Sequence, residues 1–297
     1  QAGLYPPGST FKTITSIAAL RKGIDPRETV HCNGKYALGN HLFHCWKKGG
    51  HGSVNMHDGL KHSCDVYFYE MARRAGIDEI AKAATEFGLG QTYDFEVPGE
   101  KSGIVPTRDW KRAATGESWQ QGETLISGIG QGFLLTSPLQ LCVMMARIAN
   151  GGMAVKPRLT RAIGGELVPM PPAPMIDVDP EFLKIVQSGM NGVSNEPGGT
   201  AFRSRITEAG FELAGKTGSA QVRRISMAER DGGVRKNDAL EWRLRDHALF
   251  ICFAPVDNPQ YALSVVIEHG GSGSGAAAPV ARDIMLKVLK RNLVREE

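Results

Sequence analysis

The segment STFKTITSIAALRK spans residues 9–22 and follows a Pro-Pro-Gly turn. Its apolar side chains recur at helical spacing, at Phe11, Ile14, Ile17, Ala18 and Leu20. Because Gly23 closes this pattern, the segment predicts a buried helix that begins near Ser9. Ser9 and Lys12 then lie on the opening turn of that helix.

Ser9 and Lys12 are three residues apart, so on a helix their side chains project from one face. A hydroxyl beside an amine pairs a nucleophile with a base, because burial near a helix N-terminus disfavours the lysine charge. When it occurs without other motifs, a Ser-x-x-Lys sequence is more often a helix cap followed by a surface lysine. The other motifs of the chain must therefore decide its meaning.

Strand patterns gather near the C-terminus. They cover residues 211–222, 248–253 and 261–268, and a short turn joins the last two, which should pair as antiparallel neighbours. An amphipathic helix over residues 279–293 should lie across that sheet. These patterns predict an α+β fold.

The middle of the chain is mainly helical in pattern. Helices are expected over residues 66–74, 77–87, 139–149 and 181–190. Residues 31–56 are rich in Gly, His and Lys without a sustained period, which predicts an irregular excursion that needs another source of order. Residues 223–246 are densely charged and predict a solvated loop.

Bulk composition narrows the class of protein. The chain has 297 residues, is 41% hydrophobic and carries a net charge of +4 from 35 basic and 31 acidic residues. It is long enough for a full core, and its charge is too mild and too mixed to indicate nucleic acid. No run of 18 apolar residues is present, so we expect no membrane span within it.

Two further triplets accompany the serine–lysine pair. Ser63-Cys64-Asp65 follows the first helix, and Lys216-Thr217-Gly218 lies within the first strand pattern. A glycine at 218 would let a substrate backbone approach the strand, while Lys216 and Thr217 offer a cation and a hydroxyl to an anionic terminus. In this order, the three motifs form the signature of penicillin-binding proteins and serine β-lactamases.

The resemblance extends beyond these motifs. The stretches YPPGSTFK (residues 5–12), WKKGGHG (46–52), GIGQG (128–132) and GKTGSAQV (215–222) are similar to class B penicillin-binding proteins. More narrowly, they resemble the penicillin-binding protein 2 subgroup of rod-shaped elongation. The resemblance implies one transpeptidase domain over residues 1–297, in which an antiparallel sheet has helices on both sides and an all-helical lobe. Family strands before the first motif are expected to be missing.

The same resemblance assigns roles to residues. It implies that Ser9 attacks the penultimate D-Ala carbonyl of a stem peptide, that Lys12 takes the serine proton and that Ser63 relays a proton to the leaving D-Ala. Lys216 and Thr217 would hold the terminal carboxylate. The backbone N–H groups of Ser9 and Ser219 would form the oxyanion hole.

Asp65 departs from the wider family, which usually carries Asn. An ionised carboxylate donates no hydrogen bond, which puts the amide-to-substrate contact of that family in doubt here. The elongation subgroup accepts aspartate at this position. Asp65 is expected instead to steady a protonated Lys12.

A possible metal site surrounds the second triplet. Cys32, Cys45, His51 and Cys64 are separated by twelve, five and twelve residues, and six of the eight histidines share their region, residues 31–64. Four such ligands suit a closed tetrahedral zinc site. Some elongation-type relatives resemble this, with acidic residues where Cys32 and Cys45 stand. A zinc here would fix the loop that carries Ser63 and bind no substrate.

Alternatives to this metal set remain open. A Cys32–Cys45 disulfide would suit an oxidising periplasm, although it leaves His51 and Cys64 unexplained. The alternative histidine ligands, any of which would replace one member of this set, are His31, His41, His44 and His62. The remaining cysteines, Cys142 and Cys252, lie in apolar patterns and are expected in the core.

Two rival functions fit parts of the sequence. A class D-like serine β-lactamase or β-lactam sensor shares the first and third motifs, but it tends to an aliphatic residue where Asp65 stands. A non-catalytic peptidoglycan-binding scaffold would keep the fold, yet Ser9, Lys12 and Lys216 are intact. The lifetime of a penicillin adduct separates the first rival from a transpeptidase.

Partners and location follow from the resemblance alone. It implies peptidoglycan stem peptides and β-lactams as ligands, and a SEDS-type glycan polymerase with rod-complex proteins as partners through parts outside this chain. The chain opens eight residues before the first motif, which suggests a piece of a longer protein. We expect a place on the periplasmic face of the bacterial inner membrane, with the anchor elsewhere.

Overall fold

A central buried helix carries the first motif. The computed structural model describes residues 3–94, 96–170, 172–223, 225, 229 and 232–296. The 3₁₀ turn Gly8–Phe11 leads directly into α1 (Lys12–Arg21), and residues 12–20 of α1 are all buried. The predicted buried helix is confirmed, with its first turn tighter than an α-helix.

The sheet has three described strands in the order β7-β8-β9, all antiparallel. They are β7 (Ala214–Ala220), β8 (His247–Ala254) and β9 (Tyr261–Ile267). The predicted pairing of the last two strands is confirmed. β7 is shorter than the predicted 211–222, because its ladder with β8 runs only from Ala214, opposite Phe253, to Ala220, opposite His247.

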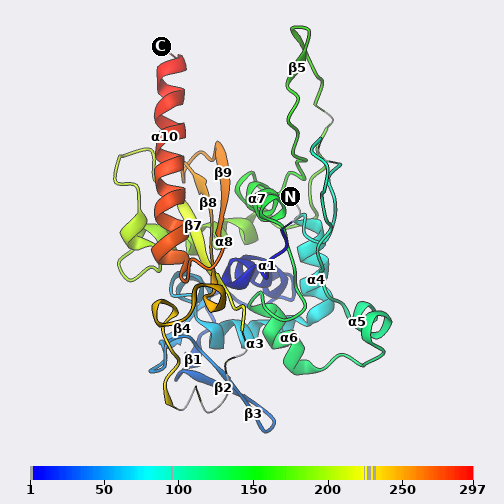
Figure 1. The fold of residues 1–297 in the computed structure, drawn as a ribbon, viewed down its shortest axis with the longest axis vertical. Helices are drawn as coiled ribbons and strands as arrows, with labels where there is room; N and C mark the ends of the chain where they lie inside the picture. Colours follow the sequence, from blue (N-terminus) through cyan, green and yellow to red (C-terminus); the bar gives the residue numbers. More distant parts are fainter. Residues whose placement is uncertain are drawn as a thin grey trace.

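Both faces of the sheet are covered by helices (Figure 1). Leu249, Ile251 and Phe253 join one hydrophobic cluster with α1, whereas Phe250 and Cys252 face a second cluster with the final helix. That helix, α10 (Ala278–Glu296), follows a π-helical turn at Gly273–Ala277. The α+β class and the core position of Cys252 are confirmed, and Cys142 is partly buried.

The remaining helices form a lobe beside the sheet, and the last two of them also pack against its strands. They are α2 (Met56–Lys61), α3 (Asp65–Ala75), α4 (Ile77–Glu86), α5 (Arg108–Thr115), α6 (Gln121–Gly128), α7 (Pro138–Ala149) and α8 (Pro180–Asn195). The four predicted helices are confirmed. The predicted end of α8 at residue 190 is wrong, because the helix continues to Asn195. Gly192 does not stop the helix but allows close packing, since a Cβ there would meet His57 Nε2 at 2.8 Å.

Residues 31–56 are more regular than predicted. β1 (Val30–Cys32) pairs with β4 (Gly52–Val54), and β2 (Lys35–Leu38) pairs with β3 (His41–His44), both antiparallel. The prediction of an irregular excursion is therefore wrong. Strands of three or four residues are too short to show an alternating pattern in the sequence.

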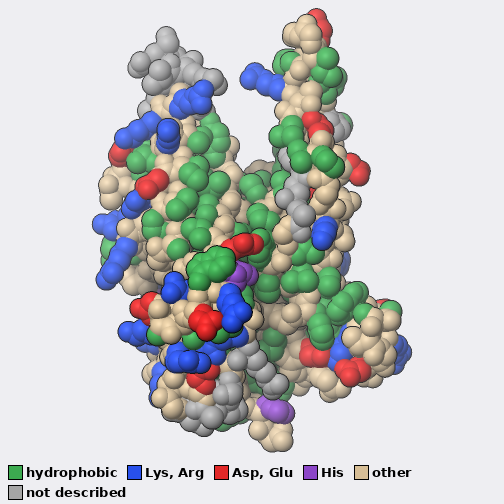
Figure 2. All heavy atoms as spheres, in the orientation of Figure 1, with side chains coloured by type: hydrophobic (Ala, Val, Ile, Leu, Met, Phe, Trp, Pro, Cys, Tyr) green, Lys and Arg blue, Asp and Glu red, His purple; other side chains and the backbone are tan. Residues whose placement is uncertain are grey.

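Other segments project or run along the surface. A hairpin of β5 (Ala162–Ile163) and β6 (Glu166–Leu167) stands out from the body, and apolar side chains gather on it in Figure 2. Within the predicted charged loop, two 3₁₀ turns occur at Asn237–Ala239 and Trp242–Leu244. Residues 224, 226–228, 230 and 231 of that loop lie outside the described residues. No described helix is both long and apolar enough to cross a bilayer.

Candidate active site

Ser9 lies in the 3₁₀ turn that precedes α1. In a 3₁₀ turn the side chains at i and i+3 eclipse, so Ser9 and Lys12 share one face. Ser9 is half-buried, and its hydroxyl forms no hydrogen bond with any other described residue. The predicted nucleophile is therefore available to an incoming group.

Lys12 is fully buried and held from several sides. Its Nζ lies 2.7 Å from Asp65 Oδ1, 2.9 Å from the Ser63 carbonyl and 3.2 Å from Ser63 Oγ. The Phe68 ring lies below it, with the amine 5.5 Å from the ring centroid. The expected ion pair between Lys12 and Asp65 is present.

Lys216 reaches the same serine from the sheet. Its Nζ donates to Ser63 Oγ at 2.9 Å and to the Thr217 carbonyl at 3.2 Å, and the side chain is fully buried. Burial lowers the pKa of Lys216 well below its ordinary value, and the charge of Lys12 lowers it further. The Ser63 hydroxyl thus bridges two lysines, and among the described residues Lys12 alone pairs with a carboxylate.

Ser63 occupies an unusual backbone conformation. Its φ is +53°, in the left-handed region that residues with a Cβ seldom adopt. The Ser63 N–H donates to the Leu60 carbonyl, and its own carbonyl accepts from Lys12 and from the Trp46 indole. These contacts hold the strained turn between α2 and α3, as is common at functional sites.

Asp65, the first residue of α3, uses both carboxylate oxygens. Oδ1 pairs with Lys12, while Oδ2 accepts the backbone N–H of Trp46 at 2.9 Å. The Trp46 indole N–H also donates to the carbonyls of His62 (3.2 Å) and Ser63 (3.1 Å). Trp46 therefore clamps the triplet, although 62% of its surface is exposed.

Thr217 and Gly218 line β7 beside the nucleophile turn. Thr217 Oγ1 lies 2.8 Å from Thr200 Oγ1, so two hydroxyls meet at the strand. A Cβ at Gly218 would lie 2.9 Å from Thr10 Cγ2 and 3.0 Å from the Pro7 carbonyl. The structure thus gives Gly218 a packing reason, because β7 rests directly on the turn that carries Ser9.

The backbone N–H and C=O groups of Ser219 point to the side of β7 that faces away from β8. Its carbonyl accepts from Gln131 Nε2 at 3.0 Å, and within a strand the N–H and C=O of one residue point to the same side. The Ser219 N–H therefore shares this free edge. The GIGQG segment also fixes the nucleophile turn, since the Gly8 N–H donates to the Gly130 carbonyl at 2.8 Å.

The predicted metal ligands form one cluster next to the triplet. The ligand atoms of Cys32, Cys45, His51 and Cys64 all lie within 4.8 Å of one another. His51 Nδ1 is 3.7 Å from Cys32 Sγ and 3.5 Å from Cys45 Sγ. Zinc bonds of ~2.3 Å to sulfur and ~2.0 Å to nitrogen put tetrahedral S and N ligands ~3.6 Å apart, so the donor set fits zinc.

The alternatives to this ligand set find no support. Cys32 and Cys45 are both free thiols, so they form no disulfide. His31, His41, His44 and His62 are absent from the ligand cluster found among the described residues. Burial lowers the pKa of His51, which favours its neutral, metal-binding form. Cys45 and Cys64 share one hydrogen bond, which lowers the pKa of the Cys45 thiol and raises that of Cys64, so without a metal this pair favours a single thiolate on Cys45.

Three residues that contact the site had no role assigned from the sequence. They are Trp46, Gln131 and Thr200. Trp46 and Gln131 fall inside the WKKGGHG and GIGQG stretches, which carried the resemblance as wholes. Thr200 follows a Pro-Gly-Gly turn and meets Thr217 only through tertiary folding. A serine on a helix-opening turn, two buried lysines and a Lys-Thr-Gly strand at its side define the penicillin-recognising class of serine acyltransferases.

Comparison with known families agrees with this geometry. The chain matches the penicillin-binding protein transpeptidase domain over residues 2–286. It belongs to that family. The curated peptidoglycan D,D-transpeptidase MrdA of Acinetobacter baumannii is 38% identical over 306 residues, which cover 99% of this chain and 44% of that protein. The chain thus spans under half the length of such relatives.

Solved structures give the same result. PBP2 of Pseudomonas aeruginosa, in complex with WCK 5153, is 39% identical with a TM-score of 0.82, covering 95% of this chain and 58% of that one. PBP2 of Helicobacter pylori, in complex with MreC, is 32% identical with a TM-score of 0.84, covering 97% and 50%. The predicted resemblance to penicillin-binding protein 2 is confirmed.

Proposed function

We propose that this domain is a peptidoglycan D,D-transpeptidase that cross-links stem peptides through an acyl-enzyme on Ser9. The carrying observation is the Ser63 hydroxyl, which joins the amines of Lys12 and Lys216 beside the nucleophile turn. Such a connected set can move a proton from an attacking hydroxyl to a leaving amine. The MrdA relative bears the same activity in its name.

Acylation needs one proton to leave Ser9 and one to reach the leaving group. Ser9 Oγ attacks the carbonyl carbon of the penultimate D-Ala while Lys12, on the same face of the turn, accepts the hydroxyl proton and passes its own proton through Ser63 to the amine of Lys216. The C–N bond then breaks, and the terminal D-Ala amine takes a proton through Ser63. The amine of a second stem peptide reverses these steps, which forms the cross-link and restores the Ser9 hydroxyl.

The tetrahedral intermediate places negative charge on the former carbonyl oxygen. We assign its stabilisation to the backbone N–H groups of Ser9 and Ser219. The free edge of β7 supports this assignment, because Gln131 accounts for the Ser219 carbonyl and leaves the N–H directed to the same side. Donors fixed by backbone need no reorganisation when the charge develops.

The terminal carboxylate of the substrate would lie over Thr217. Its hydroxyl and that of Thr200 offer two donors at one point of the strand. Lys216 is fully buried, so we propose that its amine acts on the carboxylate through Ser63 and the strand. This arrangement retains the expected carboxylate role of the Lys-Thr-Gly motif.

We also propose a structural zinc held by Cys32, Cys45, His51 and Cys64. Cys64 is the N-cap of α3 and lies between Ser63 and Asp65, so a zinc would fix the loop that carries both. Metal analysis after chelator-free purification should find about one zinc per chain, and chelation should slow acylation. A metal-free protein with reactive thiols at positions 45 and 64 would contradict the proposal.

Partners and location extend the proposal to the whole protein. The H. pylori PBP2 was solved with MreC, which supports a rod-complex partner for this chain. We propose the same setting here, with a SEDS-type polymerase, at the periplasmic face of the inner membrane. β-Lactams would acylate Ser9 as substrate mimics. A fluorescent penicillin tests this directly, because it should label the chain and fail to label Ser9→Ala.

A further inference from the structure

The segment that follows α8 brings Thr200 to the strand that carries Thr217. α8 ends at Asn195, and residues 196–200 continue with the sequence EPGGT. Two adjacent glycines leave the backbone of such a segment free to adopt many conformations. The 2.8 Å approach of the Thr200 and Thr217 hydroxyls therefore depends on contacts that anchor the segment.

Glu196 anchors the beginning of this segment to α2. One carboxylate oxygen accepts the Lys61 amine at 2.7 Å, and the other lies 3.0 Å from His57 Nε2. His57 and Lys61 are four residues apart on α2, so their side chains lie on the same face of that helix. The hydrogen bond from Lys61 lowers the pKa of Glu196, so the carboxylate stays ionised at neutral pH.

The C-terminal end of α2 holds the rest of the segment. The Lys61 carbonyl accepts the Thr200 N–H at 3.3 Å, and His62 Nδ1 lies 3.2 Å from the Gly198 carbonyl. The residue after His62 is Ser63, whose hydroxyl joins the two buried lysines of the site. One helix end therefore positions both Ser63 and Thr200.

The His57 ring is fixed before it meets Glu196. Its Nδ1 lies 3.2 Å from Ser188 Oγ on α8, so both ring nitrogens have partners. α2 also packs closely on α8, where a Cβ at Gly189 would lie 2.5 Å from Leu60 Cδ1. Residues whose rotamers are locked by such contacts can hold a binding group to about 0.5 Å. Glu196 thus meets a donor whose position is already set.

We propose that Glu196 is a positioning residue for recognition of the substrate's terminal carboxylate. Through Lys61 and His57 it keeps Thr200 beside Thr217, so that two hydroxyls meet the carboxylate together. Glu196 itself touches no substrate. This inference rests on the proposed transpeptidase function and adds a specificity determinant to it. As a substrate mimic, a penicillin would place its own carboxylate at these hydroxyls, whereas a penicillin ester has no charge to place there.

The test compares benzylpenicillin with its methyl ester as acylating agents of the full chain. Mass spectrometry of quenched samples gives the dissociation constant before acylation and the first-order acylation rate. Glu196→Ala should raise the dissociation constant of benzylpenicillin about tenfold with the acylation rate unchanged, because one hydrogen bond to a charged group is misplaced. The ester should react with both proteins alike. Glu196→Gln keeps an acceptor for Lys61 and should show a smaller rise.

A double-mutant cycle shows whether Glu196 acts through Thr200. Thr200→Val removes the hydroxyl at nearly constant volume and should itself raise the dissociation constant of benzylpenicillin. In that background Glu196→Ala should add no further rise, because the hydroxyl that it positions is gone. Effects that add in the double variant would contradict the proposal. Glu196→Gln takes the place of the alanine variant in the cycle if the latter does not fold.

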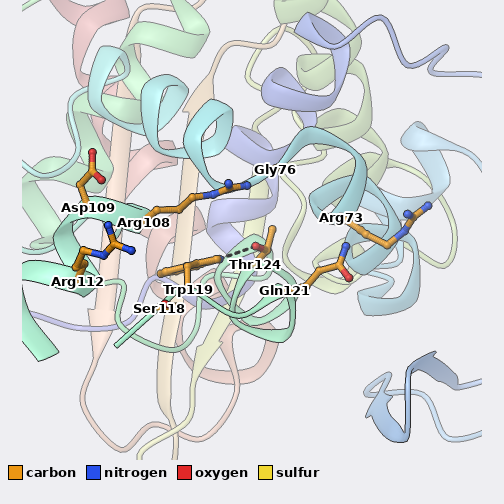
Figure 3. A pocket seen from close by; sticks show the side chains of 9 residues that line it. All are labelled: Arg73, Gly76, Arg108, Asp109, Arg112, Ser118, Trp119, Gln121 and Thr124. Carbon is orange, nitrogen blue, oxygen red and sulfur yellow. Dashed lines mark hydrogen bonds between the residues drawn. The ribbon is translucent and has the colours of Figure 1, made fainter. Parts of the chain in front are cut away.

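Glu123→Ala is the matched control for a lost lysine–glutamate pair. Glu123 accepts the Lys111 amine at 2.6 Å and lies in α6 between Gln121 and Thr124. These two neighbours line a cavity of about 500 Å³ (Figure 3). α6 packs on α3 and α4, whereas Glu196 faces α2. The control should lower Tm and leave the preference for the free acid over the ester unchanged.

Three outcomes would overturn the proposal. They are a dissociation constant within twofold of wild type in a folded Glu196→Ala, an equal rise for the acid and the ester, and an equal rise in the control. If the wild-type chain reacts with neither compound, the proposed function fails separately. Calorimetry of both compounds with Ser9→Ala then decides: a preference for the free acid that Glu196→Ala abolishes supports the positioning role, and an unchanged or absent preference refutes it.

Discussion

Removal of the Ser63 hydroxyl perturbs the centre of the proposed proton path. In Ser63→Ala, Lys216 loses its 2.9 Å acceptor and keeps only the Thr217 carbonyl, while Lys12 keeps Asp65 and the Ser63 carbonyl. A buried donor left short of a partner costs about 1–3 kcal/mol. For a domain of this size, that lowers Tm by about 2–4 °C per kcal/mol. Loss of general acid–base transfer should slow acylation about 10²–10⁴-fold.

A second serine separates these two effects. Ser194 is fully buried, and its hydroxyl has no hydrogen-bond partner among the described residues, so Ser194→Ala should change neither Tm nor rate appreciably. Acylation would be followed by stopped-flow mixing with a fluorescent penicillin, and Tm by calorimetry. Acylation of a folded Ser63→Ala within threefold of wild type would refute the role of Ser63 in proton transfer.

Three further substitutions probe the surrounding contacts. Asp65→Asn leaves Lys12 without its carboxylate and should lower the free energy of unfolding, measured by chemical denaturation, by about 3–5 kcal/mol. An unchanged denaturation midpoint would show that the ion pair does not stabilise the fold. Burial depresses the pKa of Lys216, so the native state binds fewer protons than the unfolded chain and its stability rises with pH up to the ordinary value of 10.5. Lys216→Met has no amine to titrate, so its stability should not rise with pH in this way. The stability of the variant minus that of wild type should therefore be greatest at neutral pH and decline toward pH 10. A difference that stays constant with pH would contradict the lowered pKa of Lys216. Trp46→Phe removes the indole donor and should slow acylation about fivefold, from a bond worth about 1 kcal/mol, whereas Trp242→Phe, which starts from a similar exposure of 61%, should not; equal effects would deny Trp46 a positioning role.

The chemistry-bearing residues were largely predictable because their motifs are local. The Ser9–Lys12 spacing fixes both side chains on one turn whatever the rest of the fold does. The strands at 248–253 and 261–268 were visible because apolar runs and a turn marked them. The cysteine–histidine cluster was found from residue types alone, since its chemistry is distinctive even though its spacing matches no standard finger.

What the sequence did not show depends on contacts between distant segments. No local pattern reveals that Thr200 meets Thr217 or that the Trp46 indole reaches the Ser63 carbonyl. The packing reason for Gly218 likewise appears only when β7 rests on Thr10 and Pro7. The short strands of residues 30–54 were missed because their pairing, more than their intrinsic preference, determines them.

Mass spectrometry of the intact chain with a penicillin tests the central proposal most directly. We expect one adduct per chain, located on Ser9 by peptide mapping, absent from Ser9→Ala and stable for hours. Rapid release of the hydrolysed drug would instead indicate a serine β-lactamase. An adduct on any other residue, or one that persists in Ser9→Ala, would contradict the assignment of Ser9 as the nucleophile.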